Sequence, residues 1–197
     1  TWHYPGGQLE EVEFGVPVRI NVENAVAAMA IAHLNGVTVE ELRSGIASFK
    51  GSHRRFEKVL DTERVVLIDD YAHHPVELDA AIRSVREIYS GKHIMGIFQP
   101  HLYSRTADFY QDFAKSLSML DQVVLLDIYP ARELPLPGVT SRLILDLIEN
   151  PNKTLVSKND LLDYLHGNEI PDVVLILGAG DIDRLVIPVK QYLQTLC

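Results

Sequence analysis

Hydrophobic positions follow two periods along most of this chain. Short runs rich in β-branched residues, such as residues 65–68 and 173–177, are typical of strands buried on both faces of a parallel sheet. Between such runs, apolar residues recur every three or four positions, which indicates amphipathic helices. Because strands and helices alternate, the pattern predicts an α/β fold with a doubly wound, mostly parallel sheet and helices on both faces, a Rossmann-like architecture.

The predicted elements can be placed along the chain. The strands predicted at residues 56–60 and 64–69 flank a polar turn and could form a hairpin. The later strands of this part of the chain are each separated by a helix. The last helix contains Pro188, at which we expect a kink or a restart. Strands are predicted at residues 56–60, 64–69, 93–99, 122–128, 153–156 and 173–177, and the expected helix starts are Pro75, Ser104 or Thr106, Thr140, Asn159 and Ile182.

The first fifty residues follow a different plan. Two short strands, at residues 1–4 and 9–14, surround a Pro-Gly-Gly turn, and two helices follow. Asn21 is expected to cap the first helix and Thr38 the second. These elements are too few to bury a core alone. We therefore expect residues 1–51 to be a partial-domain appendage, the tail of a preceding domain, and residues 52–197 to form the α/β domain.

Composition and charge restrict the class of partner. The chain has 197 residues, of which 47% are hydrophobic and 23% charged, as in ordinary globular proteins. A net charge of −9 argues against non-specific binding of nucleic acid or of anionic membranes. No apolar run reaches membrane-spanning length, nothing resembles a signal peptide, and the single cysteine, Cys197, excludes an internal disulfide. These features predict a cytoplasmic protein.

The densest group of ionisable residues is the motif DDYAHHP at residues 69–75. It lies between a predicted strand and a helix, the position at which open α/β sheets bind ligands. Four ionisable side chains there favour a binding site, although acids and histidines in such loops also serve as turn and cap residues. A metal site is disfavoured, because four successive ligand types cannot all face one ion.

Two further loops carry polar residues after strands. QPHLYSRT at residues 99–106 contains His101 and Arg105, and GAGD at residues 178–181 allows a backbone to approach a ligand closely. Right-handed crossovers would bring all three loops to one edge of the sheet. Arg105 could bind a carboxylate through its guanidinium or pair with Asp108 at the surface. His101, taken alone, is more often a buried structural histidine.

The residues by themselves define no complete active site. The chain has no glycine-rich loop followed by Lys-Ser/Thr and no G-x-S-x-G elbow. Arg54 and Arg55 could contact phosphate or belong to a solvated linker. Glu133, in a proline-rich loop, could meet a substrate amine or face solvent. These residues support a ligand-binding α/β domain.

Several motifs, in order, resemble the C-terminal domain of the Mur ligases. They are RRFE at 54–57, DDYAHHP at 69–75, QPHLYSRT at 99–106 and GAGDI at 178–182. NVENA at 21–25 is similar to the helix start that ends the central ATP-binding domain of that family. The resemblance covers essentially the whole chain and is strongest to the branch that joins L-alanine to UDP-N-acetylmuramate in peptidoglycan synthesis.

The resemblance implies an enzyme of three domains, of which this chain would supply the last and the tail of the second. ATP would activate the muramyl carboxylate as an acyl phosphate, which the amine of L-alanine then attacks. ATP and Mg²⁺ would be held mainly by the central domain, with no metal site in this chain. The isolated chain is therefore expected to be catalytically incomplete.

The resemblance also implies two groups of binding residues. The residues expected to bind the nucleotide are Asn21, Asn24, Arg55 and Asp70. Those expected to bind the amino acid are Tyr71, His73, His101 and Arg105, with Arg105 as the partner of its carboxylate. Two positions depart from the family pattern: Ile20 replaces a common histidine and Leu102 a common arginine.

Two other functions fit parts of the sequence. A recycling ligase that attaches a preformed tripeptide to the same UDP-sugar shares the DDxAHHP element, but its later loop departs from QPHxYSRT. A non-catalytic domain that binds a nucleotide or an amino acid would also lack a phosphate loop. A Gly-x-x-Gly-Lys-Thr/Ser loop encoded upstream would favour the three-domain ligase.

Overall fold

The computed structural model describes residues 1–16 and 18–197, with the side chains of Arg19 and Ile20 outside the description. The expectation attached to Ile20 therefore lies outside the described residues. The chain divides into two compact units, Thr1–His53 and Arg54–Cys197. The boundary expected from the sequence lies between residues 51 and 52.

The first unit is a two-stranded hairpin with two helices. Strands β1 (Trp2–Tyr4) and β2 (Gly7–Leu9) pair antiparallel, and helices α1 (Arg19–Leu34) and α2 (Val39–Ser48) follow. Thr38 caps α2 as predicted, in a capping box with Glu41. A small apolar cluster joins the hairpin to the helices; its buried members are Trp2, Leu9, Met29 and Leu42.

Two predictions for this unit are wrong. The second strand does not span residues 9–14 but Gly7–Leu9, because the chain turns at Gly6, whose φ is +96°, and the partner strand reaches only to Trp2, which pairs with Leu9. Helix α1 begins at Arg19 with Val18 at the N-cap, so Asn21 lies inside the first turn and caps nothing. The Nδ2 atom of Asn21 is buried and has no hydrogen-bond partner among the described residues.

The second unit is built on a six-stranded sheet with the order β3-β4-β8-β5-β6-β7. Only the edge strand β3 is antiparallel to its neighbour, and the predicted hairpin of β3 and β4 is confirmed. The strands span Glu57–Asp61 (β3), Val66–Asp70 (β4), Ile94–Phe98 (β5), Gln122–Leu125 (β6), Lys153–Leu155 (β7) and Val173–Leu177 (β8). Strands β5 and β8 are buried along their whole length, as their continuous apolar sequences predict.

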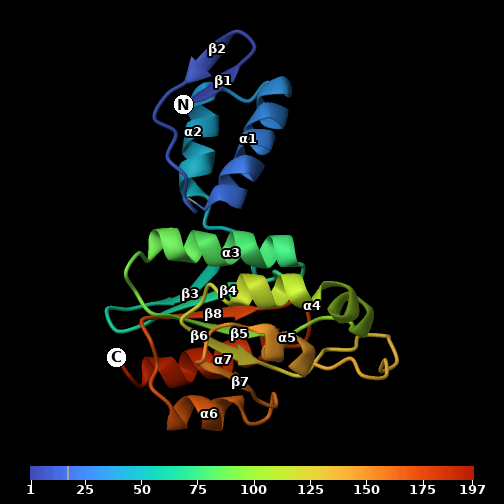
Figure 1. Ribbon diagram of the computed structural model, residues 1–197. Helices are drawn as coiled ribbons and strands as arrows, with labels where there is room; N and C mark the ends of the chain where they lie inside the picture. Colours follow the sequence, from blue (N-terminus) through green and yellow to red (C-terminus); the bar gives the residue numbers. More distant parts are fainter. Residues whose placement is uncertain (17) are drawn as a thin grey trace. The chain divides into compact units, whose positions relative to one another are not determined.

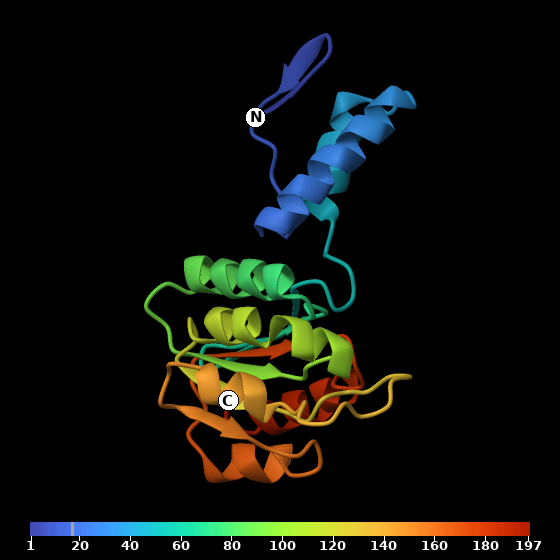
Figure 2. The same cartoon turned by 45° about the vertical axis from the view of Figure 1, so that its right-hand side comes forward.

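Helices cover both faces of this sheet (Figures 1 and 2), and the doubly wound α/β prediction is confirmed. Helices α3 and α4 pack side by side on one face, and α6 and α7 pack together on the other. The helices span Pro75–Ile88 (α3), Tyr103–Leu117 (α4), Arg142–Leu147 (α5), Leu161–Gly167 (α6) and Asp183–Gln194 (α7). No helix within the described ranges is long and apolar enough to cross a membrane.

Three details of the helices differ from the sequence prediction. Helix α7 is continuous, with Pro188 inside it rather than at a restart. Asp160, not Asn159, stands at the N-cap of α6. Helix α4 has Leu102 at its N-cap and no side-chain cap, so neither Ser104 nor Thr106 has the predicted role.

The register of the sheet aligns the ends of its parallel strands. Asp70 at the end of β4 pairs with Leu177 of β8, which in turn pairs with Phe98 of β5. We call this side of the sheet, with the loops that follow β4, β5, β6 and β8, the carboxyl edge, and the opposite side the amino edge. All three motif-bearing loops therefore leave the sheet at the carboxyl edge.

Candidate functional site

The buried side chain of Arg54 connects several segments at the carboxyl edge. Arg54 is only 9% exposed, and its Nε lies 3.4 Å from the carboxylate of Asp69, which is fully buried. Its guanidinium donates to the carbonyl oxygen of Gly178 at 2.5 Å and lies 4.9 Å from the ring centroid of Tyr71. Arg54 thus links the segment before β3 to the ends of β4 and β8.

Asp70 orders the backbone around it. Its two carboxylate oxygens accept the amides of Phe56 at 2.7 Å and Ala72 at 2.8 Å. Burial raises the pKa of this carboxyl, while the two amides and the nearby Arg55 oppose that shift. Arg55 itself is exposed, and its guanidinium lies 5.4 Å from the ring of Tyr71.

Tyr71 and His73 form one wall of aromatic rings. Their ring centroids are 5.3 Å apart in an edge-on arrangement, and the ring of His73 lies 5.9 Å from that of His101. The Nδ1 atom of His73 is 2.9 Å from the carbonyl oxygen of Tyr71 and 3.2 Å from the carboxylate of Glu77. Glu77 also accepts the amides of His73 and His74, so this histidine is held at both its backbone and its ring.

His101, in the loop after β5, and Arg105, in the first turn of α4, lie beside these rings. The Nδ1 atom of His101 lies 3.4 Å from Nη1 of Arg105, and its ring contacts Tyr129 on the other side. Burial, reinforced by the charge of Arg105, lowers the pKa of His101. Among residues 1–16 and 18–197, Arg105 forms no ion pair, and in particular none with Asp108.

The glycines of the last loop leave no room for side chains. A Cβ on Gly178, whose φ is +144°, would lie 2.9 Å from the carbonyl oxygen of Gln99. A Cβ on Gly180 would lie 2.6 Å from the side chain of Gln99 and 2.7 Å from Tyr129. Gln99 also bridges the loops, because it accepts the amide of Ile182 and donates to Asp181. The close packing of two strand ends explains these glycines.

Asp181 forms a further link at this edge. Lys158 pairs with its carboxylate, and although burial opposes the change, the hydrogen bonds from Lys158 and Gln99 lower the pKa of Asp181. This group ties the start of α7 to the loop before α6. These contacts of Asp181 fix the GAGD turn at residues 178–181, and they are separate from the contacts between the rings of Tyr71, His73 and His101.

The structure brings together one of the two predicted groups of residues. Tyr71, His73, His101 and Arg105 form one continuous cluster at the carboxyl edge. Arg55 and Asp70 lie beside it, on the Tyr71 side. Asn21 and Asn24 belong to the first unit and lie on α1.

Sequence reasoning missed several residues that build this edge. It considered Arg54 only together with Arg55, and it gave Gln99 and Tyr129 no role. Gln99 follows a buried strand directly, which is a usable signal. Tyr129 has none, because its contact with His101 joins segments that are far apart in the sequence.

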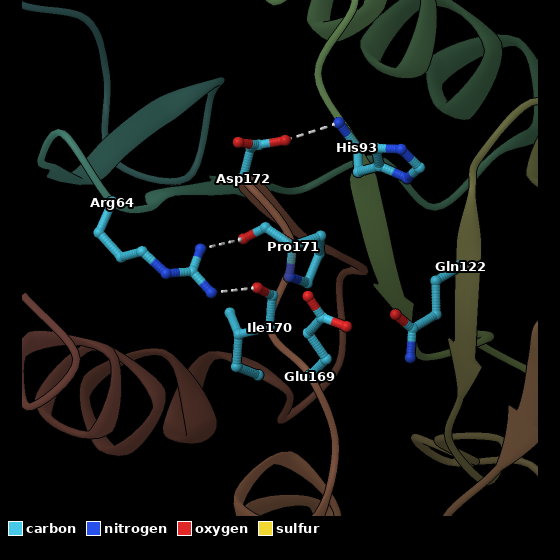
Figure 3. A pocket seen from close by; sticks show the side chains of 7 residues that line it. All are labelled: Arg64, His93, Gln122, Glu169, Ile170, Pro171 and Asp172. Atoms are coloured by element: carbon cyan, nitrogen blue, oxygen red, sulfur yellow. Dashed lines mark hydrogen bonds between the residues drawn. The ribbon is translucent and has the colours of Figure 1, made fainter.

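Two pockets lie at opposite ends of the strands. One, of about 310 Å³, is at the carboxyl edge between Tyr103, Asp127 and the loop at residues 135–141. The other, of about 350 Å³, is at the amino edge (Figure 3), where Arg64 donates to the carbonyl oxygens of Ile170 and Pro171. Asp172 there accepts the amide of His93 at 2.9 Å.

The arrangement of carboxylate, imidazole and thiol groups bears on metal binding. Within the described ranges, no three such groups lie together in a way that could hold an ion. Asp69 faces Arg54, and Asp70 faces backbone amides. The residues that the structure describes therefore do not fit a magnesium site.

The fold and the groups at the carboxyl edge indicate a class of protein. A doubly wound domain that gathers a cation, imidazoles and close-packed glycines at the carboxyl ends of its strands has the features typical of ligand-binding α/β domains. The chain belongs to the Mur ligase family, since the profile described as "Mur ligase, glutamate ligase domain" matches residues 54–180. The resemblance stated from the motifs is thereby confirmed.

Sequence identity to individual proteins supports the same family. The chain is 98% identical over its whole length to a UDP-N-acetylmuramate–L-alanine ligase of Porphyromonas gingivalis strain W83, of which it covers 43%. It is 59% identical, over 96% of its length, to the ligase of the same name from Parabacteroides distasonis, of which it covers 41%. The chain thus spans less than half the length of these relatives.

Solved structures show the same fold. UDP-N-acetylmuramate-alanine ligase MurC from Thermotoga maritima superposes with a TM-score of 0.78 at 28% identity, over 96% of this chain and 41% of that one. A murein peptide ligase from Psychrobacter arcticus superposes with a TM-score of 0.59 at 22% identity, covering 93% of this chain and 38% of that one. At that identity the likeness extends to the fold alone.

Proposed function

We propose that this chain is the C-terminal part of an ATP-dependent ligase that joins L-alanine to UDP-N-acetylmuramate in the cytoplasm. The observation that carries the proposal is the 98% identity, over the whole chain, to a relative of that name. At this identity, the motif-bearing loops of the two proteins can carry out the same chemistry. Residues 52–197 would receive the amino acid, and residues 1–51 would complete a preceding ATP-binding domain.

The cluster at the carboxyl edge suits a small amino acid. Arg105 offers a guanidinium without an ion-pair partner among the described residues, and a guanidinium matches a carboxylate in a bidentate manner. The rings of Tyr71, His73 and His101 lie in contact with one another beside it. His101, whose pKa is lowered, would remain neutral at physiological pH and so would not repel an incoming ammonium group.

The nucleotide would lie on the other side of Tyr71. Arg55 is exposed there and could meet phosphate oxygens, while Asp70 shapes the turn and could accept a ribose hydroxyl. Asn21, whose buried Nδ2 has no hydrogen-bond partner among the described residues, and the exposed Asn24 would contact the adenine. These four roles are proposals that follow the order of the family motifs.

Exposed apolar residues in the first unit support its assignment to a larger domain. Helix α1 leaves Ile31 64% exposed and Leu34 82% exposed, one turn apart on the same side of the helix. Apolar side chains in such a position are normally covered. The remainder of the ATP-binding domain would cover them, and it would also hold Mg²⁺ and the phosphate loop.

This chain would take part in only one step of the reaction, the attack of the amine on the acyl phosphate. ATP would convert the muramyl carboxylate to an acyl phosphate on the other domains. The carboxyl edge would then orient the amine of L-alanine towards that carbonyl carbon and exclude water, so that aminolysis outcompetes hydrolysis. Formation of the amide releases phosphate and a proton.

The proposal is tested in the full-length protein by steady-state kinetics of Arg105→Ala. Loss of a charged hydrogen-bonded pair of about 1.5–3 kcal/mol predicts a rise of roughly 10- to 100-fold in the KM for L-alanine. The KM for ATP should change little, because Arg105 is on the amino-acid side. An unchanged KM for L-alanine would remove Arg105 from the pocket.

The same assay separates the alternative functions. A tripeptide-recycling ligase would release ADP with the tripeptide and UDP-N-acetylmuramate but not with L-alanine. A non-catalytic binding domain would release none with either amine, although it would still bind one of the ligands. ADP release dependent on L-alanine is the result that our proposal requires.

A further inference from the structure

The helix that carries Arg105 begins in an unusual way. Leu102, at the N-cap of α4, has a φ of +74° and provides no side-chain cap. Positive φ is disfavoured for a leucine because its Cβ is crowded in this region. The first amides of the helix therefore need acceptors from elsewhere.

The carboxylate of Glu133, 29 residues after Ser104 in the sequence, supplies such acceptors. Glu133 accepts the backbone amide of Ser104 at 3.0 Å through Oε2 and the hydroxyl of Ser104 at 2.5 Å through Oε1. An anion at a helix N-terminus also interacts favourably with the helix dipole. These hydrogen bonds lower the pKa of Glu133, so the carboxylate stays charged at physiological pH.

The loop that bears Glu133 is fixed at its start as well. The amide of Leu102 donates to the carbonyl oxygen of Tyr129 at 2.9 Å, and the amide of Tyr129 donates to that of Pro100 at 2.8 Å. The rings of Tyr129 and His101 are 5.6 Å apart. Residues 129–133 thus hold the segment from His101 to Arg105 at both of its ends.

We propose that Glu133 is a positioning residue, which fixes the start of α4 and so sets the placement of Arg105 and His101 for amino-acid binding. The inference rests on the proposed function of this site. Both oxygens of the Glu133 carboxylate accept hydrogen bonds from Ser104, and these are the contacts through which it would hold the start of the helix. Its effect on the substrate passes through Ser104.

The experiment compares Glu133→Ala, Glu133→Gln, Ser104→Ala and the Glu133→Ala/Ser104→Ala double variant in the full-length protein. Because small displacements of a binding group weaken its contacts steeply, Glu133→Ala should raise the KM for L-alanine about tenfold, with little change in the KM for ATP. Glu133→Gln retains an acceptor oxygen for the amide of Ser104 and should recover most of that loss. The double variant should resemble Glu133→Ala, because the two side chains act as one unit.

Asp172→Ala is the matched control. Asp172 is also a carboxylate that accepts a backbone amide, that of His93, but it lies at the amino edge. It should leave the KM for L-alanine unchanged. An equal rise in Asp172→Ala would show a general loss of structure and would overturn the positioning role.

Other outcomes also decide the question. If Glu133→Gln is as impaired as Glu133→Ala while Ser104→Ala is normal, Glu133 binds the substrate directly. If Glu133→Ala leaves the KM for L-alanine unchanged while Arg105→Ala raises it, the positioning inference fails and the proposed function stands. If neither variant changes it, the proposed pocket itself is wrong.

Discussion

The two edges of the sheet present similar groups in different settings. Each has a pocket of a few hundred Å³, an arginine that donates to backbone carbonyls and a carboxylate that accepts a backbone amide. At the carboxyl edge, however, Arg54 is 9% exposed and lies against the fully buried Asp69. At the amino edge, Arg64 is exposed and Asp172 pairs with the exposed Lys92.

This contrast indicates which features distinguish the candidate functional edge from the other. The pocket at the amino edge is slightly the larger, so volume does not separate the two. Buried charge, clustered rings and glycines without space for a Cβ occur together at the carboxyl edge. The buried charge and the positive-φ backbone of Gly178 carry a cost in stability, and such costs are typical of functional sites.

The largest expected difference concerns the two arginines. Arg54→Met keeps much of the side-chain volume but removes the cation beside buried Asp69, and it should lower the free energy of unfolding by about 3 kcal/mol. Arg64→Met loses hydrogen bonds that are partly exposed and should cost less than about 1 kcal/mol. Urea unfolding of the 197-residue chain, followed by circular dichroism, measures both. Equal losses would contradict the distinction between the edges.

A smaller effect is expected from a pair of glycines. In Gly180→Ala the new Cβ would meet Gln99 and Tyr129 at less than 3 Å, which should cost about 1–3 kcal/mol. Gly167→Ala, at the end of α6, places its Cβ in open space and should stabilise the protein by up to about 1 kcal/mol. Thermal unfolding of the two variants gives the comparison. A neutral Gly180→Ala would mean that the loops at this edge are not closely packed.

Sequence periodicity predicts the elements well but their assembly poorly. Runs such as residues 173–177 are apolar enough to identify buried strands without neighbours. The insertion of β8 between β4 and β5 is a choice between non-local pairings, and no pattern within any one strand encodes it. The carboxyl edge could still be anticipated, because parallel strands share one direction whatever their order.

In the candidate site, too, the positions of some residues follow from local sequence, whereas those of others depend on tertiary packing. His101 lies just before helix α4 and Arg105 in its first turn, so their proximity follows from local sequence. Arg54 and Arg55 are adjacent and chemically identical, and only the packed structure determines that Arg54 is buried and Arg55 exposed. Capping of α4 by Ser104 or Thr106 was a reasonable local prediction, but the acceptor comes from Glu133 in another loop. Local rules fail where a tertiary partner replaces the local one.

We propose that the carboxyl edge, and not the amino edge, receives the ligands. Hydrogen–deuterium exchange of the full-length protein, with and without UDP-N-acetylmuramate, a non-hydrolysable ATP analogue and L-alanine, tests it most directly. We predict slower exchange in residues 70–77, 99–106 and 129–133, and unchanged exchange in residues 91–93 and 168–172. Protection confined to the amino edge, or equal at both edges, would contradict this account.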